Sequence, residues 1–426
     1  MRHDGIGFFF LNIGHFFDHL FVLIFATVAA LALANQWQMS YAELIPYATP
    51  GFIAFGICAI PAGWLADKWS REGMMVIFFI GIGLSSACTA LAQTPLHVGV
   101  GLFAVGVFAA IYHPVGIAMV IHGRERTGVP LAVNGVFGNL GVAFAPLFTG
   151  LLIDTVGWRS AFLLPGVVCV AVGLAYAAFV FANRAANEQR TAASSKAATG
   201  KIQLDKSLLI RVFAIIFFST AIGGLLFQST TFALPKIFDE RLQDIASSAT
   251  LIGSYAFVVF AIAALGQLVV GYLVDNYSIR TVFAAIAASQ AVFFTVMQEL
   301  SGALALIVAV GFMLVVFGQI PINDVLVGRI TRSEWRSRVL ALRYIVTFSV
   351  MASAVPLIAW VHAHWGFATL FLIMAIAAAC TFIAVLMLPR TGPVMGRVAQ
   401  ASTSYATAVW DISMWAPRIR QRHRRQ

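Results

Sequence analysis

Charged side chains are scarce in this sequence. Asp, Glu, Lys and Arg make up 10% of its 426 residues, whereas roughly a quarter of the residues of a soluble globular domain carry a charge. Apolar residues reach 60%, and the mean hydropathy is +0.89. The composition therefore excludes an ordinary soluble domain and is typical of an integral membrane protein.

Cysteine is rare as well. Cys58, Cys88, Cys169 and Cys380 each lie in a different apolar segment, and no two of them have the spacing of a metal-binding pair. This arrangement excludes a disulfide framework and a cysteine-type metal site. We interpret the four thiols as small packing residues.

The sequence also lacks the glycine loop that binds nucleotide phosphates. It contains no Gly-x-x-x-x-Gly-Lys-Ser/Thr pattern, and the short pattern at Gly99 and Gly101 lies inside an apolar run rather than between a strand and a helix. The chain by itself is therefore not an ATP-driven pump. We expect no enzyme activity and no bound cofactor.

Long apolar runs, in contrast, are abundant. Because about 20 consecutive apolar residues cross a bilayer as a helix, these runs predict transmembrane helices. The first run carries His15, Asp18 and His19, so we interpret it as an uncleaved helix rather than a signal peptide. The twelve predicted spans are 8–34, 44–66, 73–92, 96–121, 127–153, 159–182, 208–235, 246–273, 281–299, 303–328, 337–361 and 367–388.

The formal net charge of +10 is distributed unevenly along the chain. All Lys and Arg residues except Arg159, Lys236 and Arg241 fall at the N-terminus, on the even-numbered connections or in the C-terminal tail. By the positive-inside rule, both termini are cytoplasmic, and we expect a multi-pass protein of the bacterial inner membrane. No contiguous basic face with stacking aromatics indicates nucleic-acid binding.

The sequence contains an internal repeat. Gly63-Trp-Leu-Ala-Asp67-Lys68-Trp-Ser-Arg71 has an echo in Gly271-Tyr-Leu-Val-Asp275-Asn-Tyr-Ser-Ile-Arg280. Pro146 and Pro356, and Gly157 and Gly366, recur at nearly the same offset. We therefore predict an N-terminal six-helix half (1–182), a cytoplasmic linker (183–206), a C-terminal six-helix half (207–388) and a basic tail (389–426). Paired halves with the substrate path between them are typical of secondary transporters.

The repeated loop resembles the signature between helices 2 and 3 of the major facilitator superfamily. The matching residues are Gly63, Leu65, Ala66, Asp67, Lys68 and Arg71. This resemblance implies an all-α membrane protein with twelve transmembrane helices in two pseudo-symmetric halves, the major facilitator fold. It also implies that the Asp braces the cytoplasmic side while the outer side is open.

Further motifs are similar to the fosmidomycin-resistance-type branch of that superfamily. They are Tyr112-His113-Pro114, the run from Asn134 through Gly138-Asn139-Leu140-Gly141, and in part His15-Phe-Phe-Asp18-His19. The chain departs from the branch at Val115 and at His19, where the branch carries acidic residues. The resemblance implies a proton-driven efflux carrier for drugs or small metabolites.

Ionisable residues inside the predicted spans are candidates for function. An ionisable group in mid-membrane costs about 2.5–3.5 kcal/mol on insertion scales, so it normally faces a cavity or a partner. His15, Asp18 and His19 share one helical face. With His113 they form our candidate proton-coupling cluster. A structural hydrogen-bond network and a transition-metal site remain open alternatives.

Other polar residues are candidates for substrate contact and gating. Tyr112, Asn134, Asn139, Gln228 and Asn323 are candidates for the substrate cavity, and their chemistry fits a weakly charged or amphipathic small molecule better than a polyanion. Asp324 and Arg343 are candidates for a gating pair, or for a static brace. Gly63, Asp67, Lys68, Arg71, Asp275 and Arg280 form the repeated loop motif.

The sequence thus predicts a monomeric, proton-coupled carrier that works by alternating access in the bilayer. Its substrate is a small molecule, and efflux is the favoured direction. Import of a metabolite, and transport of a transition-metal ion, an iron chelate or an organic acid through the His15/Asp18/His19/His113 cluster, remain alternatives. A channel is disfavoured because the duplicated halves and the linker suit two rocking bundles.

Overall fold

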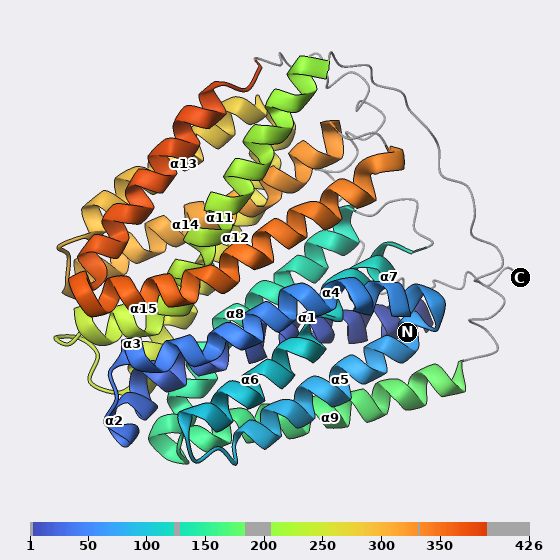
Figure 1. Ribbon diagram of the computed structural model, residues 1–426, viewed down its shortest axis with the longest axis vertical. Helices are drawn as coiled ribbons and strands as arrows, with labels where there is room; N and C mark the ends of the chain where they lie inside the picture. Colours follow the sequence, from blue (N-terminus) through green and yellow to red (C-terminus); the bar gives the residue numbers. More distant parts are fainter. Residues whose placement is uncertain (1–2, 123–127, 184–205, 331–332, 390–426) are drawn as a thin grey trace, which may run out of the picture.

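The computed structural model of the protein describes residues 3–122, 128–183, 206–330 and 333–389. Helices dominate these residues (Figure 1). The predicted linker apart from Asn183 and Lys206, and the predicted tail apart from Pro389, lie outside them. The N-terminal half contains α1 (His3–Val28), η1 (Ala29–Leu33), α2 (Ala34–Trp37), α3 (Tyr41–Leu44), η2 (Ile45–Ala48), α4 (Thr49–Lys68), α5 (Arg71–Thr89), α6 (Pro95–Ala109), η3 (Tyr112–Gly116), α7 (Ile117–Ile121), α8 (Gly128–Thr155) and α9 (Trp158–Ala182). The C-terminal half contains α11 (Lys206–Arg241), α12 (Ala249–Asn276), α13 (Ile279–Met297), α14 (Gly302–Ile330) and α15 (Ser333–Leu386).

Eleven helical stretches of the described chain are long and apolar enough to cross a membrane. Helices are expected here because a lipid-exposed backbone has to satisfy its own hydrogen bonds. The last stretch, Ile345–Leu386, has 42 residues, about twice a single span. Gly366 interrupts it with φ 71° and ψ −176°, so it contains two spans, and the predicted total of twelve is confirmed.

Some predicted boundaries were wrong by several residues. The seventh span continues to Arg241 instead of ending at 235, and the eighth begins at Ala249 instead of 246. The extension of α11 includes Lys236 and Glu240, which the hydropathy pattern had placed in a connection. Helical geometry thus continues past the point where the apolar run stops.

The two halves repeat each other in local conformation. Gly157, before α9, has φ 99°, and Gly366, between the last two spans, has φ 71°. A positive φ is strained for residues with a β-carbon, so glycine at both places fits the turn. In each half this turn joins the fifth helix to the sixth, as the internal repeat predicts.

The halves lie side by side, with α1–α9 on one side and α11–α15 on the other (Figure 1). The helix α1 starts at one end of the bundle, which we call the N-terminal end. The opposite end, where α2, α3 and the connection between α11 and α12 lie, is the far end. The loop from Asp67 to Arg71 belongs to the N-terminal end.

The helices α8 and α12 bring the backbones of the two halves into direct contact. A β-carbon on Gly150 would overlap the carbonyl oxygen of Ala249, and one on Gly253 would overlap that of Pro146. These contacts lie toward the far end of both helices. The glycines therefore allow the halves to close tightly there, as small residues do in membrane helix pairs.

Proline has different effects in different helices. The fourth span is interrupted around Pro114: α6 ends at Ala109, η3 is a π-helix, and α7 follows it. This break lies beside His113, at a proline that has no backbone N–H to donate. In contrast, α8 and α15 continue through Pro146 and Pro356.

Candidate functional site

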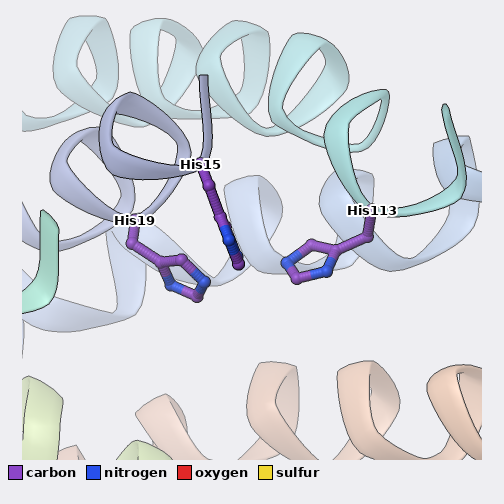
Figure 2. Close-up of side chains that lie close together, drawn as sticks. All are labelled: His15, His19 and His113. Atoms are coloured by element: carbon purple, nitrogen blue, oxygen red, sulfur yellow. The ribbon is translucent and has the colours of Figure 1, made fainter. Parts of the chain in front are cut away.

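Three histidines from two parts of the N-terminal half converge on one point. His15 and His19 project from α1, and His113 projects from η3 (Figure 2). One ring nitrogen of each lies within 4.8 Å of one nitrogen of each other ring. The ring centroids are 5.0–5.6 Å apart. The structure therefore brings together three imidazoles that the sequence placed on two different spans.

His15 is held in one orientation from both sides of its ring. Its Nδ1 lies 2.7 Å from the carbonyl oxygen of Asn134, so Nδ1 carries the proton and donates. Its Nε2 has no hydrogen-bond partner among the described residues and is buried. The ring passes directly over Gly138, where a β-carbon would be only 2.7 Å from Nε2. Gly138 thus leaves room for the ring on α8.

Asp18 is the one carboxylate of this cluster. Its side chain has no exposed surface, and its Oδ2 lies 3.4 Å from Nε2 of His113. Its Oδ1 has no hydrogen-bond partner in the described part of the chain. A buried carboxylate with such sparse support is costly unless it gains a proton, a cation or a ligand. Asp18 does not face lipid, as the proposed coupling role requires.

Aromatic rings connect this cluster to the C-terminal half. Phe348 of α15 lies 5.8 Å from the ring centre of His113 and 4.6 Å from that of Phe55 on α4. Phe55 itself lies 5.8 Å from His113. His113 therefore contacts residues at the interface between the halves. A change in its charge or position acts directly on that interface.

Tyr112 and Asn134 form a hydrogen-bonded brace behind the histidines. The hydroxyl of Tyr112 donates to the carbonyl of Leu11 at 2.7 Å and accepts from Nδ2 of Asn134 at 2.8 Å. The same amide donates to Oδ1 of Asn12 at 3.0 Å. Both side chains are buried. They link α1, η3 and α8, and their predicted contact with substrate stays a prediction.

The candidate amides of the C-terminal half differ in their surroundings. Asn323 accepts a hydrogen bond from Ser219 at 3.1 Å, and Gln319 donates to the carbonyl of Ser219. Gln228 is 1% exposed, and its Nε2 has no hydrogen-bond partner among the described residues. Gln228 is therefore the candidate whose side-chain amide could donate a hydrogen bond to a substrate. Asn139, on α8, is also buried.

The repeated loop motif lies at the N-terminal end of the bundle. Arg71 donates to Asp67 at 2.8 Å, and the Asp67 side chain is 67% exposed. Lys68 ends α4. A β-carbon on Gly63 would be 3.3 Å from Cβ of Pro114, so the motif packs against the fourth span beside the site. The predicted brace across the bundle stays a prediction.

The remaining gating candidates are only partly described. Asp275 is exposed near the end of α12, and Arg280 is partly exposed near the start of α13. Arg343 is buried on α15. The side chain of Asp324 lies outside the described residues, so the predicted pair with Arg343 stays a prediction.

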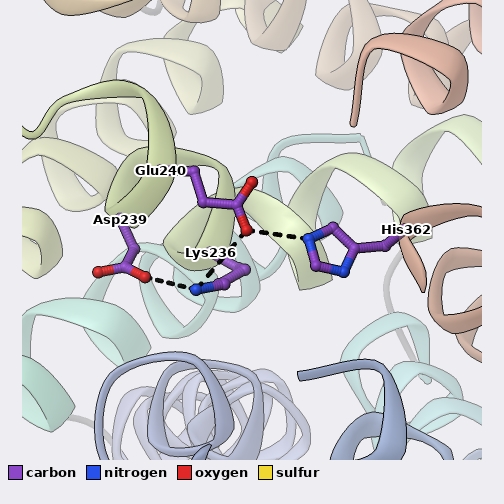
Figure 3. Close-up of polar contacts among 4 residues, drawn as sticks. All are labelled: Lys236, Asp239, Glu240 and His362. Atoms are coloured by element: carbon purple, nitrogen blue, oxygen red, sulfur yellow. Dashed lines mark hydrogen bonds and ion pairs between the residues drawn. The ribbon is translucent and has the colours of Figure 1, made fainter. Parts of the chain in front are cut away.

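The sequence analysis missed a second polar cluster, at the far end (Figure 3). Lys236 pairs with Asp239 at 2.6 Å and with Glu240 at 3.6 Å, and Glu240 pairs with His362 of α15 at 2.9 Å. The ring of Tyr41, from α3 in the other half, lies 5.5 Å from His362. The spacing of Lys236 and Glu240, one helical turn apart, was the signal available in the sequence.

Asp154 joins the two halves at the same end. Its Oδ2 accepts from the backbone N–H of Thr250 at 2.7 Å and from the Thr250 hydroxyl at 2.5 Å. It thereby caps the N-terminus of α12 from the opposite half. A cavity of about 390 Å³ lies beside this contact, lined by Asp154, Asp239, Gln243 and Ser247 among others.

Comparison with known proteins agrees with this architecture. The family model of the Major Facilitator Superfamily matches residues 11–243 and 216–418. The chain therefore belongs to the Major Facilitator Superfamily and is a multi-pass membrane transporter. The predicted superfamily is confirmed, and the fosmidomycin-resistance-type branch stays a prediction.

Individual relatives match only part of their length. The probable hexose phosphate transport protein of Chlamydia trachomatis is 30% identical over 128 residues, which are 29% of this chain and 27% of that protein. The tetracenomycin C resistance and export protein of Streptomyces glaucescens is 26% identical over 162 residues, 37% of this chain and 29% of that protein. The chain is thus matched over less than a third of the length of these relatives.

A solved structure matches over nearly the whole chain. The crystal structure of a bacterial homologue of the human lysosomal transporter Spinster has a TM-score of 0.71 and 14% sequence identity, and the match covers 91% of this chain and 98% of that one. At this identity the similarity shows the fold.

Proposed function

We propose that this protein moves a small, weakly charged or amphipathic molecule across the bacterial inner membrane in exchange for protons, with efflux as the working direction. The observation that carries the proposal is the position of Asp18. It is a fully buried carboxylate 3.4 Å from His113, and His113 contacts Phe348 of the other half. A proton bound there thus acts where the two halves meet.

The chemistry of coupling follows from the two protonation states. With Asp18 ionised and His113 protonated, opposite charges attract and hold α1 against η3. When Asp18 binds a proton, that attraction is lost and His113 is released to shift against Phe55 and Phe348. Proton binding is thereby coupled to the interface between the halves.

The contacts between halves support a state closed at the far end. Asp154 binds Thr250, Tyr41 contacts His362, and α8 and α12 meet at Gly150 and Gly253. With both termini in the cytoplasm, as the basic connections indicate, the far end is periplasmic and this state opens inward. Alternating access then requires these far-end contacts to break.

The proposed substrate class rests on three buried side chains. Gln228 offers an amide donor, and Phe55 and Phe348 offer aromatic faces beside His113. An aromatic or amphipathic molecule of modest size satisfies these groups. The export function named for the Streptomyces relative supports efflux.

The test uses purified protein reconstituted in liposomes. A panel of weakly charged aromatic drugs and metabolites is first screened for thermal stabilisation of the protein, and a hit is then used in flux assays. Asp18→Asn should abolish uphill transport driven by a pH gradient and retain saturable counterflow. Asp244→Asn, an exposed carboxylate of the α11–α12 connection, is the control and should transport normally. Normal gradient-driven transport by Asp18→Asn would refute the proposal.

A further inference from the structure

The three imidazoles have a geometry that proton exchange alone does not require. A single proton relay needs one donor and one acceptor, whereas here His15, His19 and His113 direct one nitrogen each toward a shared point (Figure 2). We propose that this triad binds one divalent transition-metal ion of the late first row, with Zn²⁺ as the representative ion.

The His15 ring is already arranged as a metal ligand. Its Nδ1–H is bonded to the carbonyl of Asn134, which fixes the tautomer with a lone pair on Nε2. That Nε2 has no hydrogen-bond partner in the described residues, and the side chain is 7% exposed. Metal-binding histidines characteristically donate their other N–H to a carbonyl or a carboxylate. A metal ion would satisfy the buried Nε2, which is otherwise costly.

Asp18 lies beside the third ligand of the triad. Its Oδ2 is 3.4 Å from Nε2 of His113, the nitrogen at the tip of the ring, which points toward His15 and His19 (Figure 2). The negative charge of this buried carboxylate would also partly neutralise the positive charge of a divalent cation bound next to it. The triad thus has a backbone carbonyl behind His15 and a carboxylate beside the nitrogen that His113 directs at the shared point.

The distances suit a small tetrahedral ion. Zn–N bonds of about 2.0–2.1 Å place the nitrogens of a tetrahedral site about 3.4 Å apart. The ligand nitrogens here lie within 4.8 Å of one another, so the widest pair has to close by about 1.4 Å. His19 and His113 are partly exposed and can rotate toward His15, which is fixed. Three protein ligands leave a fourth position open for water or another ligand.

The ligand set also decides between metals. Three neutral imidazoles favour Zn²⁺, Ni²⁺, Co²⁺ or Cu²⁺, whereas Mg²⁺ and Ca²⁺ require oxygen ligands. No cysteine belongs to the triad, so a soft thiolate site is not the model. The inference concerns binding in the absence of any gradient. It uses His113 and Asp18, which the proposed proton coupling also uses, so a bound Zn²⁺ ion would compete with a proton on His113.

The experiment is a metal titration of the full chain, purified in detergent through a tag without histidines. Calorimetry and thermal stabilisation with Zn²⁺ should give one ion per chain, and Mg²⁺ should give no effect. His19→Ala and His113→Ala should each weaken Zn²⁺ binding by at least 100-fold, and Asp18→Asn, which removes a negative charge beside the ion, by about 10–100-fold, the range for residues just outside the ligand set. His97→Ala and His364→Ala, which replace exposed histidines elsewhere, should bind like the wild type.

A second measurement uses the wild-type protein, so it does not depend on whether the variants fold. Co²⁺ added to the wild-type protein should give the strong visible absorption of a four-coordinate ion, and Zn²⁺ should remove it. Zn²⁺ binding that persists in His19→Ala/His113→Ala, or wild-type protein without Co²⁺ absorption, would overturn the inference. Gradient-driven transport that depends on Asp18 in a protein without Zn²⁺ binding would reject the metal site and leave the proposed function intact.

Discussion

Gly138 of α8 lies directly beneath the imidazole of His15, at a distance that admits no side chain. A β-carbon there would be 2.7–2.9 Å from three atoms of the ring. Such contacts force either the ring or the helix to move. The Gly-Asn-x-Gly motif that begins at Gly138 therefore has a physical role: it lets α1 present His15 to the other two histidines.

We predict that Gly138→Ala displaces His15 and lowers gradient-driven transport at least tenfold while the protein still folds. Gly135→Ala is the matched control, because a β-carbon at Gly135 meets nothing within 4 Å. Both substitutions raise helix propensity by about 0.5–1 kcal/mol, so propensity cannot separate them. Transport in liposomes measures the difference. Equal activity of the two variants would show that the position of His15 is unimportant.

The contact between Asp154 and Thr250 should keep the far end closed. Asp154→Ala removes the acceptor for Thr250 and leaves the cap from Ser248 to Leu251 in place, whereas Asp154→Asn keeps an acceptor oxygen and loses the charge. In a variant without native cysteines, a maleimide should therefore label Ala246→Cys, a buried position that lines the far-end cavity, several-fold faster with Asp154→Ala, and less so with Asp154→Asn.

Thr155→Ala is the control for this experiment, because the Thr155 hydroxyl bonds to Leu151 of its own helix. Its labelling rate should equal that of the parent. An unchanged rate in Asp154→Ala would mean that the contact with Thr250 does not contribute to closure.

Gly253 should matter for the packing of the halves. Gly253→Ala places a methyl group on the carbonyl oxygen of Pro146 in α8, whereas Gly271→Ala, on the same helix, places one in open space. We expect a lower apparent melting temperature for Gly253→Ala and an unchanged or slightly higher one for Gly271→Ala. Thermal unfolding in detergent distinguishes them, and an equal melting temperature would argue against tight contact between α8 and α12.

Tyr112 should stabilise the protein through its hydroxyl. Tyr112→Phe removes one hydrogen bond to Leu11 and the acceptor for Asn134. We expect a loss of about 1 kcal/mol, the ordinary net value of a buried hydrogen bond. Tyr272→Phe, at a residue that is 59% exposed, should have no effect. An unaltered melting temperature in Tyr112→Phe would show that the brace is dispensable.

Much of the fold could be predicted from the sequence. The membrane requires long apolar helices, and matching residues such as Gly157 and Gly366 identify the internal repeat. The ends of the helices were less predictable. Hydropathy follows the bilayer, whereas α11 continues through the charged residues Lys236 and Glu240, whose charges are paired with each other and with His362.

The site could be predicted only in part. The periodicity of α1 places His15, Asp18 and His19 on one face, but it gives no distance to His113. That distance depends on the π-helix at Tyr112–Gly116 and on the space left by Gly138. The carbonyl of Asn134 could not be predicted as the partner of His15. Every residue has a backbone carbonyl, so the residue type does not indicate which one His15 contacts.

The central claim is that Asp18 carries the proton that substrate movement displaces, and proton flux tests it most directly. Liposomes containing a pH indicator report proton movement while the identified substrate exchanges across the membrane. The wild-type protein should move protons opposite to substrate in a fixed ratio, and Asp18→Asn should exchange substrate with no proton movement. Proton movement at the wild-type ratio in Asp18→Asn would contradict the account.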